Sequence, residues 1–288
     1  MSKTLRCIIP EWHGGVNPNY VLGSELLSQI APQNTNDTTI RIEVNTDFQN
    51  KINQVDGIDG GDFLLQQMAE TRRVLAAEQP DKVIVFGGDC SVTQVPFDYL
   101  NSRYNDSLGI IWLDAHPDVS NTMQSSHLHE MVLANLLGQN SDSKITKVEY
   151  PFSPDKVVLA GLIEESLREM DKACKELDLK IISPNELKKN SQQLLSWVKE
   201  YHLKHIAIHW DLDVLSPVDF RSIYPAEPYT DADLFPAAVG RMTLKDIGRI
   251  LNEVETVSEI VGLSITEHLP WDAINFRNTL APVSIFNS

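Results

Sequence analysis

Hydrophobic residues follow two alternating patterns along the chain, and each pattern predicts a different secondary structure. The first is a short apolar run that ends near Gly, Asp or Pro, and several such runs contain no polar interruption. Uninterrupted runs of this length are typical of strands buried on both faces of a parallel sheet. These runs cover residues 5–9, 40–44, 82–86, 108–113, 156–160, 205–210 and 260–265.

The second pattern places apolar residues three and four positions apart, as in an amphipathic helix. It covers residues 62–78, 128–137, 164–177, 192–202 and 244–257. Strand and helix patterns alternate from one end of the chain to the other. This alternation predicts an α/β fold with a central, mainly parallel sheet.

The chain shows no internal repeat, low-complexity tract or long linker, so we expect one domain over residues 1–288. Chains of this length often form a single α/β unit. The polar stretches 32–39 and 139–146 are predicted to be surface loops. Residues 217–236 are rich in proline and acidic residues, which favours an ordered loop beside the functional site.

Polar residues with metal-binding side chains follow four of the predicted strands. Ligands of open α/β sheets bind outside the carboxyl ends of the strands, so these residues are expected at one edge of the sheet. The four segments are Gly87-Gly88-Asp89-Cys90-Ser91, Asp114-Ala115-His116-Pro117-Asp118, Asp211-Leu212-Asp213 and Thr266-Glu267-His268.

The spacing within these segments favours a metal site. In an extended backbone, Asp114, His116 and Asp118 would point to the same side, and Asp211 and Asp213 repeat the spacing of two. One such cluster alone is also explained by helix caps or turns, in which Asp is common. Several acids without Lys or Arg among them would repel strongly unless a cation neutralised them. Carboxylates and imidazole are ligands of hard to borderline ions such as Mn(II).

In order and approximate separation, these segments resemble the successive metal motifs of the ureohydrolase family, which includes arginase, agmatinase and formimidoylglutamase. The resemblance covers positions 87 to 267. It implies a three-layer αβα fold, a pair of Mn(II) ions that activate water, and hydrolysis of a C–N bond in a small cationic guanidino or amidine substrate. It also implies a homo-oligomer, a trimer or hexamer.

The resemblance also assigns individual roles. One ion would bind Cys90, Asp114, Asp118 and Asp211, and the other His116, Asp114, Asp211 and Asp213. Asp118 therefore counts among the catalytic residues. Glu267 would pair with the cationic nitrogens of the substrate; the alternative is an exposed acid at the end of a strand.

The region after the Asp114 motif is expected to handle protons and substrate. His129 matches the family's proton-shuttling histidine, and its pKa suits that task. His127 is the competing candidate, and it also lies where the arginases carry a substrate-binding Asn. Glu164 is a further substrate-binding candidate, in the segment 161–166 that resembles an arginase motif, but the last acid of that motif is Ser166 here. L-arginine is therefore not the assured substrate, and agmatine or another guanidino compound is comparable.

Cys90 departs from the family, which normally has His at this position. A thiolate is a softer ligand that suits Zn(II) better than Mn(II). Three outcomes follow: two ions with altered preference, loss of the first ion, or a metal-poor protein with a non-catalytic binding or regulatory role. The thiol could also be reactive towards oxidants.

Composition and charge limit the binding partners and the cellular compartment that we expect for this protein. A net charge of −16 disfavours nucleic acid and anionic membranes, although such acidity also serves solubility alone. The apolar runs are too short to span a bilayer, and the N-terminus shows no signal-peptide pattern. Three widely spaced cysteines do not form a disulfide framework. A cytoplasmic protein is expected.

Overall fold

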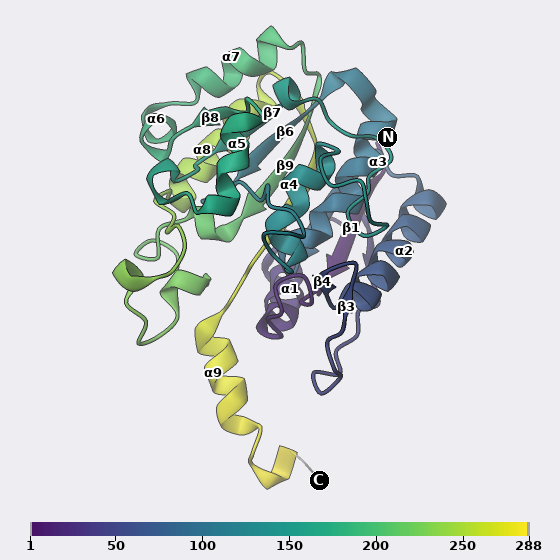
Figure 1. Ribbon diagram of the computed structural model, residues 1–288, viewed down its shortest axis with the longest axis vertical. Helices are drawn as coiled ribbons and strands as arrows, with labels where there is room; N and C mark the ends of the chain where they lie inside the picture. Colours follow the sequence, from purple (N-terminus) through teal and green to yellow (C-terminus); the bar gives the residue numbers. More distant parts are fainter. Residues whose placement is uncertain (1, 287–288) are drawn as a thin grey trace.

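The computed structural model describes residues 2–286 and is built around an eight-stranded sheet (Figure 1). All neighbouring strands in this sheet are parallel, in the order β2-β1-β5-β10-β9-β6-β7-β8. The strands are β1 (Thr4–Ile9), β2 (Thr38–Arg41), β5 (Lys82–Gly87), β6 (Leu108–Leu113), β7 (Val157–Ala160), β8 (Lys180–Ile182), β9 (His205–Asp211) and β10 (Glu259–Thr266). A separate antiparallel pair joins β3 (Gln54–Val55) to β4 (Ile58–Asp59).

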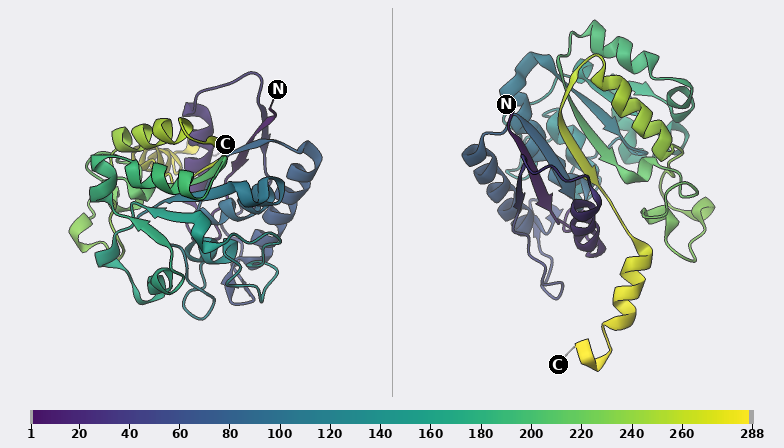
Figure 2. Two further views of the ribbon diagram at one scale, coloured as in Figure 1. Left: turned by 90° about the horizontal axis from the view of Figure 1, so that it is seen from above. Right: turned by 180° about the vertical axis from the view of Figure 1, so that it is seen from behind.

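Helices cover both faces of the sheet and complete the expected three-layer αβα fold (Figures 1 and 2). The core on one face includes residues of α2, α3 and α4, and the core on the other includes residues of α1, α6, α7 and α8. The helices are α1 (Asn19–Ile30), α2 (Gly61–Glu78), α3 (Gln94–Tyr104), α4 (Val132–Leu136), α5 (Ala173–Glu176), α6 (Pro184–Lys189), α7 (Gln192–Glu200), α8 (Leu244–Glu255) and α9 (Trp271–Leu280).

Burial on two faces explains the uninterrupted apolar runs. In β6, Ile110 and Trp112 pack into one core cluster, whereas Ile111 and Leu113 pack into the other. All six residues of this strand are buried. Each buried side chain of this size contributes about 1.5–3 kcal/mol relative to an exposed one. A polar residue on either face of β6 would therefore be costly.

Four of the strands that precede polar motifs are neighbours in the middle of the sheet. β5, β10, β9 and β6 lie side by side, in that order and all parallel. Their carboxyl ends therefore meet at one edge, as the sequence predicted. These four strands lie between residues 82 and 266, so the edge brings together segments that are far apart in the sequence.

Two predicted elements are corrected by the structure. The strand expected at residues 40–44 is β2, which begins and ends earlier and takes in the last two residues of the loop expected at 32–39. The helix expected at residues 164–177 is instead two 3-10 turns followed by the single turn of α5. Leu167 is extended between the two turns, and Asp171 accepts hydrogen bonds from the backbone and guanidinium of Arg168. These contacts start a new turn and interrupt the helical pattern.

Further elements were not predicted, namely α1, α3, α6, α9, β8 and the β3–β4 pair. Helix α9 projects away from the rest of the molecule in Figure 1 and in the right-hand view of Figure 2, with Phe276 and Ile285 exposed on this arm. Among the described residues, no helix combines the length and the hydrophobicity needed to cross a membrane. The three cysteines Cys7, Cys90 and Cys174 are free and buried.

Candidate metal centre

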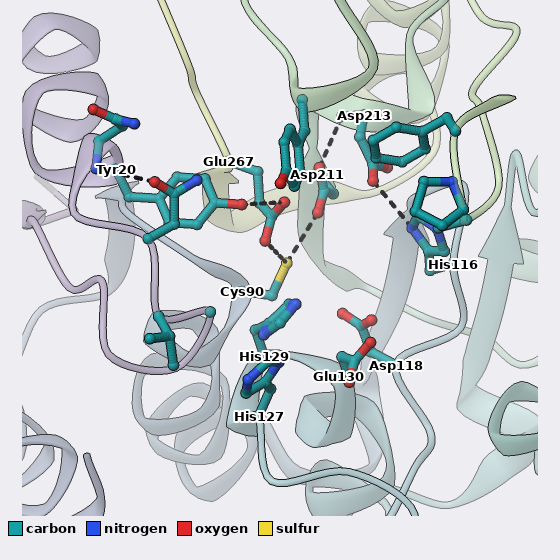
Figure 3. Close-up of a pocket in the computed structure, with 18 of the residues that line it drawn as sticks. Tyr20, Cys90, His116, Asp118, His127, His129, Glu130, Asp211, Asp213 and Glu267 are labelled. Carbon is teal, nitrogen blue, oxygen red and sulfur yellow. Dashed lines mark hydrogen bonds and ion pairs between the residues drawn. The ribbon is translucent and has the colours of Figure 1, made fainter. Parts of the chain in front are cut away.

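The predicted ligands gather at the carboxyl edge of the four central strands. Cys90 begins the turn after β5, Asp114 follows β6, Asp211 ends β9, and Glu267 follows β10. Figure 3 shows the side chains of Cys90, Asp211 and Glu267 turned towards one another. The Cys90 Sγ lies 3.0 Å from Asp211 Oδ2 and 3.8 Å from Glu267 Oε1.

The turn that carries Cys90 depends on close backbone packing. A Cβ atom on Gly88 would lie 1.7 Å from the carbonyl oxygen of Glu11, so only glycine fits there. The side chain of Asp89 then accepts a hydrogen bond from Ser91 N at 2.9 Å and caps the turn. Asp89 is therefore structural, and it fixes the direction in which Cys90 points.

Asp114, His116 and Asp118 come together, but not through an extended backbone. Residues 114–116 form a bend, in which Asp114 Oδ1 accepts a hydrogen bond from His116 N at 2.6 Å. Asp118 has a positive φ of 48°. The expectation of simple strand alternation was wrong here, because the segment turns back over the edge of the sheet. A non-glycine residue with positive φ is costly and often marks a functional site.

Asp211 and Asp213 are likewise joined by a turn rather than by a strand. Asp211 Oδ1 accepts a hydrogen bond from Asp213 N at 2.8 Å, at the start of the 3-10 turn Leu212–Val214. Asp213 then meets His116, whose Nδ1 lies 3.0 Å from Asp213 Oδ2 and 3.5 Å from Asp114 Oδ1. His116, Asp114 and Asp213 thus form one compact group of ligand atoms.

A second group includes a histidine that the sequence analysis missed. Ligand atoms of Cys90, Asp114, Asp118 and His209 all lie within 4.8 Å of one another. His209 lies on β9 two residues before Asp211, so strand alternation places both side chains on the same face. That spacing was the available signal. A third group joins Cys90, Asp211 and Glu267.

Burial and mutual repulsion make these acids hard to ionise. Burial, followed by the charge of Asp213, raises the pKa of Asp114 to about 6. Burial and neighbouring carboxylates also raise the pKa of Asp118 and Asp211 well above the usual range. At Asp213, burial alone would raise the pKa, but the adjacent His116 lowers it overall. A cluster of this kind gains from a bound cation, which favours every carboxylate in its charged form.

The donor atoms fit divalent cations. Within the described chain, the buried atoms Asp118 Oδ2 and His209 Nε2 have no hydrogen-bond partner. An unpaired buried polar atom costs about 1–3 kcal/mol, so such atoms call for a partner. Burial lowers the pKa of His209 to about 3, which keeps its imidazole neutral. Carboxylates, a neutral imidazole and a sulfur are together a metal-binding set.

Glu267 lies at the inner end of the cavity. It is 7% exposed, has a positive φ of 62°, and its Oε2 accepts a hydrogen bond from Tyr20 Oη at 2.8 Å. Burial raises its pKa to about 7, against the opposing charge of His129. A cationic group bound against this carboxylate would hold it in the ionised form.

His129 and His127 stand on the opposite wall in Figure 3, with their rings 5.7 Å apart. His129 lies in the 3-10 turn Leu128–Met131, and its Nδ1 is 2.7 Å from the carbonyl oxygen of Gly14. His127 is more exposed and has Nε2 3.7 Å from Asp59 Oδ2. Burial works against protonation of His129, but Glu267 and Glu130 raise its pKa overall.

Glu164 is not brought together with the other predicted site residues. It is exposed, lies 3.7 Å from Lys175 through its carboxylate, and is absent from the lining of the cavity. The broken helix at residues 164–177 explains this position. Arg168 from the same segment does line the cavity, but its guanidinium already pairs with Glu130 at 2.6 Å and Asp171 at 2.9 Å.

The cavity above these groups has a volume of about 500 Å³. Its inner part is acidic. Its outer part carries aromatic side chains from α9 and from residues 217–236, the segment that we expected to form a loop beside the site. The lining includes Asn17, Asn19, Tyr20, Cys90, His116, Asp118, His127, His129, Glu130, Arg168, Asp211, Asp213, Tyr224, Glu227, Phe235, Glu267 and Trp271. A small cationic molecule fits this distribution of charge.

Comparison with known proteins identifies relatives of the chain. A model of the arginase family matches residues 23–228. An arginase of Bacillus subtilis is 32% identical over 147 residues, which are 47% of this chain and 48% of that protein. An arginase of Bacillus caldovelox is 30% identical over 171 residues, 54% of this chain and 56% of that protein. The matches span about half the length of these curated relatives.

Solved structures match over more of the chain. The arginase of Entamoeba histolytica, in complex with L-ornithine, has a TM-score of 0.75 at 16% identity and covers 94% of this chain and 92% of that one. The arginase of Bacillus caldovelox gives 0.73 at 20% identity, with the same coverage. Proclavaminate amidino hydrolase of Streptomyces clavuligerus gives 0.66 at 14% identity, covering 94% and 84%. At these identities the likeness shows the fold.

Proposed function

This chain belongs to the arginase family, and from that premise we propose that it is a metal-dependent hydrolase that cleaves a linear C–N bond of a small guanidino or amidine substrate. One observation carries the proposal. Four buried aspartates, Asp114, Asp118, Asp211 and Asp213, crowd against Cys90 and His116 at the end of a cavity. Such a cluster is expected to hold divalent cations.

Two ions would share the carboxylates of the cluster. Cys90, Asp114, Asp118 and Asp211 would hold one, and His116, Asp114, Asp211 and Asp213 the other. When bound, such a pair supplies Lewis acidity and makes water nucleophilic at neutral pH. Mn(II) is the ion that the family favours, and the sulfur of Cys90 favours Zn(II).

Glu267 would bind and orient the substrate. Tyr20 fixes Oε2 of Glu267 by a hydrogen bond, and Oε1 faces the cluster near Cys90. A planar guanidinium or amidinium can donate two parallel hydrogen bonds to one carboxylate. This pairing would place the central carbon of the substrate beside the cluster and keep Glu267 ionised.

His129 would protonate the leaving amine. Its Nδ1 donates a hydrogen bond to Gly14 O when it carries the proton, and this leaves Nε2 free for the cavity. The nearby acids Glu267 and Glu130 favour the protonated ring, as a proton donor requires. His127 is the alternative, and its more exposed position suits contact with the outer part of the substrate.

A second candidate function is non-catalytic binding or regulation, and one observation favours it. The Cys90 thiol donates a hydrogen bond to Asp211 Oδ2, and burial together with the charges of Asp211 and Glu267 raises the pKa of Cys90 well above its usual range. A thiol that kept its proton would be a poor ligand. Metal content of protein purified without chelator separates the two functions, since fewer than one ion per chain would favour this candidate.

The proposal extends to the domain organisation, the oligomeric state and the partners of the protein. We propose that residues 1–288 act as one domain, that the protein is a cytoplasmic homo-oligomer such as a trimer or hexamer, and that it neither binds nucleic acid nor inserts into membranes. The net charge of −16 supports a small cationic partner over an anionic polymer. Size-exclusion chromatography with light scattering tests the oligomeric state.

The test of the proposed function is an activity screen. The protein, loaded in turn with Mn(II), Zn(II), Co(II) and Ni(II), is assayed for urea and ammonia release from arginine, agmatine, guanidinobutyrate and simple amidines. Turnover with at least one metal and substrate is expected, and Asp211→Ala should abolish it. No turnover above the Asp211→Ala variant in any combination would contradict the proposal.

A further inference from the structure

His209 stands apart from the ligand set just proposed, although it lies within the same cluster. It is fully buried on β9, and its Nε2 is one of the buried atoms without a hydrogen-bond partner in the described chain. The nearest acid is Asp114, whose Oδ2 lies 3.9 Å from Nε2. That distance is too long for a hydrogen bond, but it suits two ligands of one ion.

The ring of His209 is held in place from two sides. Its Nδ1 lies 2.9 Å from Thr93 Oγ1, which in turn lies 2.7 Å from Ser264 Oγ. The indole of Trp112 stacks on the ring at 3.7 Å between centroids, with an angle of 18° between the planes. Trp112 also donates a hydrogen bond to Asp114 Oδ2 at 3.0 Å.

These contacts are compatible with the tautomer that metal binding requires. If Nδ1 donates its hydrogen bond to Thr93 Oγ1 and Thr93 donates to Ser264, both hydrogen bonds are formed and Nε2 keeps a free lone pair. Metal-binding histidines are commonly oriented in this way, by a hydrogen bond at the nitrogen that does not bind the ion. A buried histidine that served only packing would leave Nε2 unpaired, at a cost of about 1–3 kcal/mol.

We infer that His209 binds one ion directly through Nε2, together with Cys90, Asp114 and Asp118, as a ligand beyond the set proposed above; we call this ion the inner ion and these four residues its cage. This inference rests on the proposed function, since it assumes that divalent cations bind here. The four ligand atoms lie within 4.8 Å of one another. Ligands of one ion with bonds of about 2.0–2.3 Å can be no more than about 4.0–4.6 Å apart, so slight contraction closes the cage.

The cage would change the preference of the inner ion. A sulfur and an imidazole nitrogen among carboxylates are donors that Zn(II) accepts readily. A carboxylate-rich site without sulfur suits Mn(II) better. The family normally has His where this chain has Cys90, so His209 would supply an imidazole to the inner ion in its place. Cys90 and His209 together would favour Zn(II) as the inner ion.

The test compares His209→Asn with a matched control, His205→Asn. Both histidines lie on β9, contact a hydroxyl through Nδ1 and lie against an aromatic ring, but His205 contacts Ser107 and Tyr104, away from the cluster. Asparagine can replace the Nδ1 contact and removes Nε2. Affinity for Zn(II) is measured on the full chain by competition with a chromophoric chelator, and the ligand field by the visible spectrum after Co(II) loading.

The inference predicts that His209→Asn weakens the tighter of two Zn(II) ions by roughly 100-fold or more, since loss of an outer-shell partner alone costs about 10–100-fold. The Co(II) spectrum should shift, while His205→Asn should match the unsubstituted chain. Unchanged affinity and spectrum in His209→Asn would overturn the inference and leave the proposed function standing. Failure of the unsubstituted chain to bind any ion would overturn both.

A measurement without substitution covers the case in which His209→Asn does not fold. Zn-edge X-ray absorption of the chain loaded with two ions counts imidazole scatterers. Ligation by His116 and His209 predicts an average of one imidazole per ion. An average of one imidazole per two ions would overturn the inference.

Discussion

Cys90 belongs to two of the three groups of ligand atoms. Its sulfur is within hydrogen-bonding distance of Asp211 and belongs to the same compact group as Asp114 and His209. Its exposed fraction is 1%, so solvent contributes little to its chemistry. The protonation and ligation of this atom therefore decide which ion the inner position accepts.

Replacing Cys90 should change metal preference more than metal capacity. Cys90→His exchanges a soft ligand for a borderline one, so retention of Mn(II) relative to Zn(II) should rise about tenfold or more. Elemental analysis after dialysis against equal concentrations of both ions measures the ratio. Cys90→Ser is the control, since it removes the sulfur and supplies only a weak ligand. An unchanged ratio in Cys90→His would show that sulfur does not bind the ion.

The hydrogen bond from Tyr20 to Glu267 offers a test of the substrate-binding role. Tyr20→Phe removes a donor to a carboxylate, an interaction worth about 1.5–3 kcal/mol, so KM should rise roughly 10- to 100-fold. Metal content should not change. Tyr104→Phe, which loses a hydrogen bond to the Asp81 carbonyl far from the cavity, should keep the original KM. Equal KM values in both variants would argue against substrate binding by Glu267.

The sequence predicted the carboxylate cluster because each ligand follows an apolar run that could only be a central strand. It did not predict how the ligands converge, since Asp118 and Asp213 reach the cluster through turns. His209 was missed because an isolated His inside an apolar run is usually read as core. Glu164 was assigned from a motif, but its segment breaks where Arg168 and Asp171 interact.

At the scale of elements, the turn after β5 has no room for a larger side chain at Gly88. A Cβ at Gly88 would meet the carbonyl oxygen, carbon and nitrogen of Glu11 at 1.7, 2.7 and 3.0 Å. Backbone atoms cannot rotate away as a flexible side chain can. Any larger residue at Gly88 must therefore separate the turn that carries Cys90 from the segment after β1.

Gly88→Ala should lower the free energy of unfolding by about 3 kcal/mol, the upper part of the range for overpacking. Gly248→Ala is a matched control in the middle of α8, where an added Cβ meets nothing within 4 Å. It should stabilise the chain by about 0.5–1 kcal/mol through helix propensity. Urea unfolding measures both. A Gly88→Ala variant as stable as Gly248→Ala would contradict the close packing at this turn.

The hydrophobic pattern predicted the long buried strands and the helices α2, α7 and α8, of which α7 and α8 have strong periodicity. It missed α3, which follows the Cys90 turn without a clear boundary and contains Pro96 near its start. It also missed β8, a strand of three residues at the edge of the sheet. Short edge strands and helices set by tertiary packing leave a weak periodic signal.

At the scale of the whole molecule, the excess of acids couples stability to metal binding. The net charge is −16, and part of the negative charge is concentrated in the buried cluster. Removing the ions would leave carboxylates in a site where burial and repulsion oppose their ionisation. The unfolded chain does not assemble this cluster, so ions that bind only the folded state stabilise it.

Chelation should therefore lower the melting temperature. Free metal at about 100 times its dissociation constant contributes about 2.7 kcal/mol, which corresponds to roughly 5–10 °C for a chain of this size. Differential scanning calorimetry with metal or with a chelator measures the shift. Asp211→Asn, which removes a shared ligand, should lose most of the shift. A melting temperature independent of both metal and chelator would contradict a metal-coupled fold.

The central claim is that the acids at the carboxyl edge of the sheet hold divalent cations. The most direct measurement is anomalous X-ray scattering, collected at the Zn and Mn edges from crystals of the chain grown with both metals. The account predicts two anomalous peaks, one bounded by Cys90, Asp114 and Asp118 and the other by His116 and Asp213. An absence of anomalous signal between these side chains at saturating metal would contradict it.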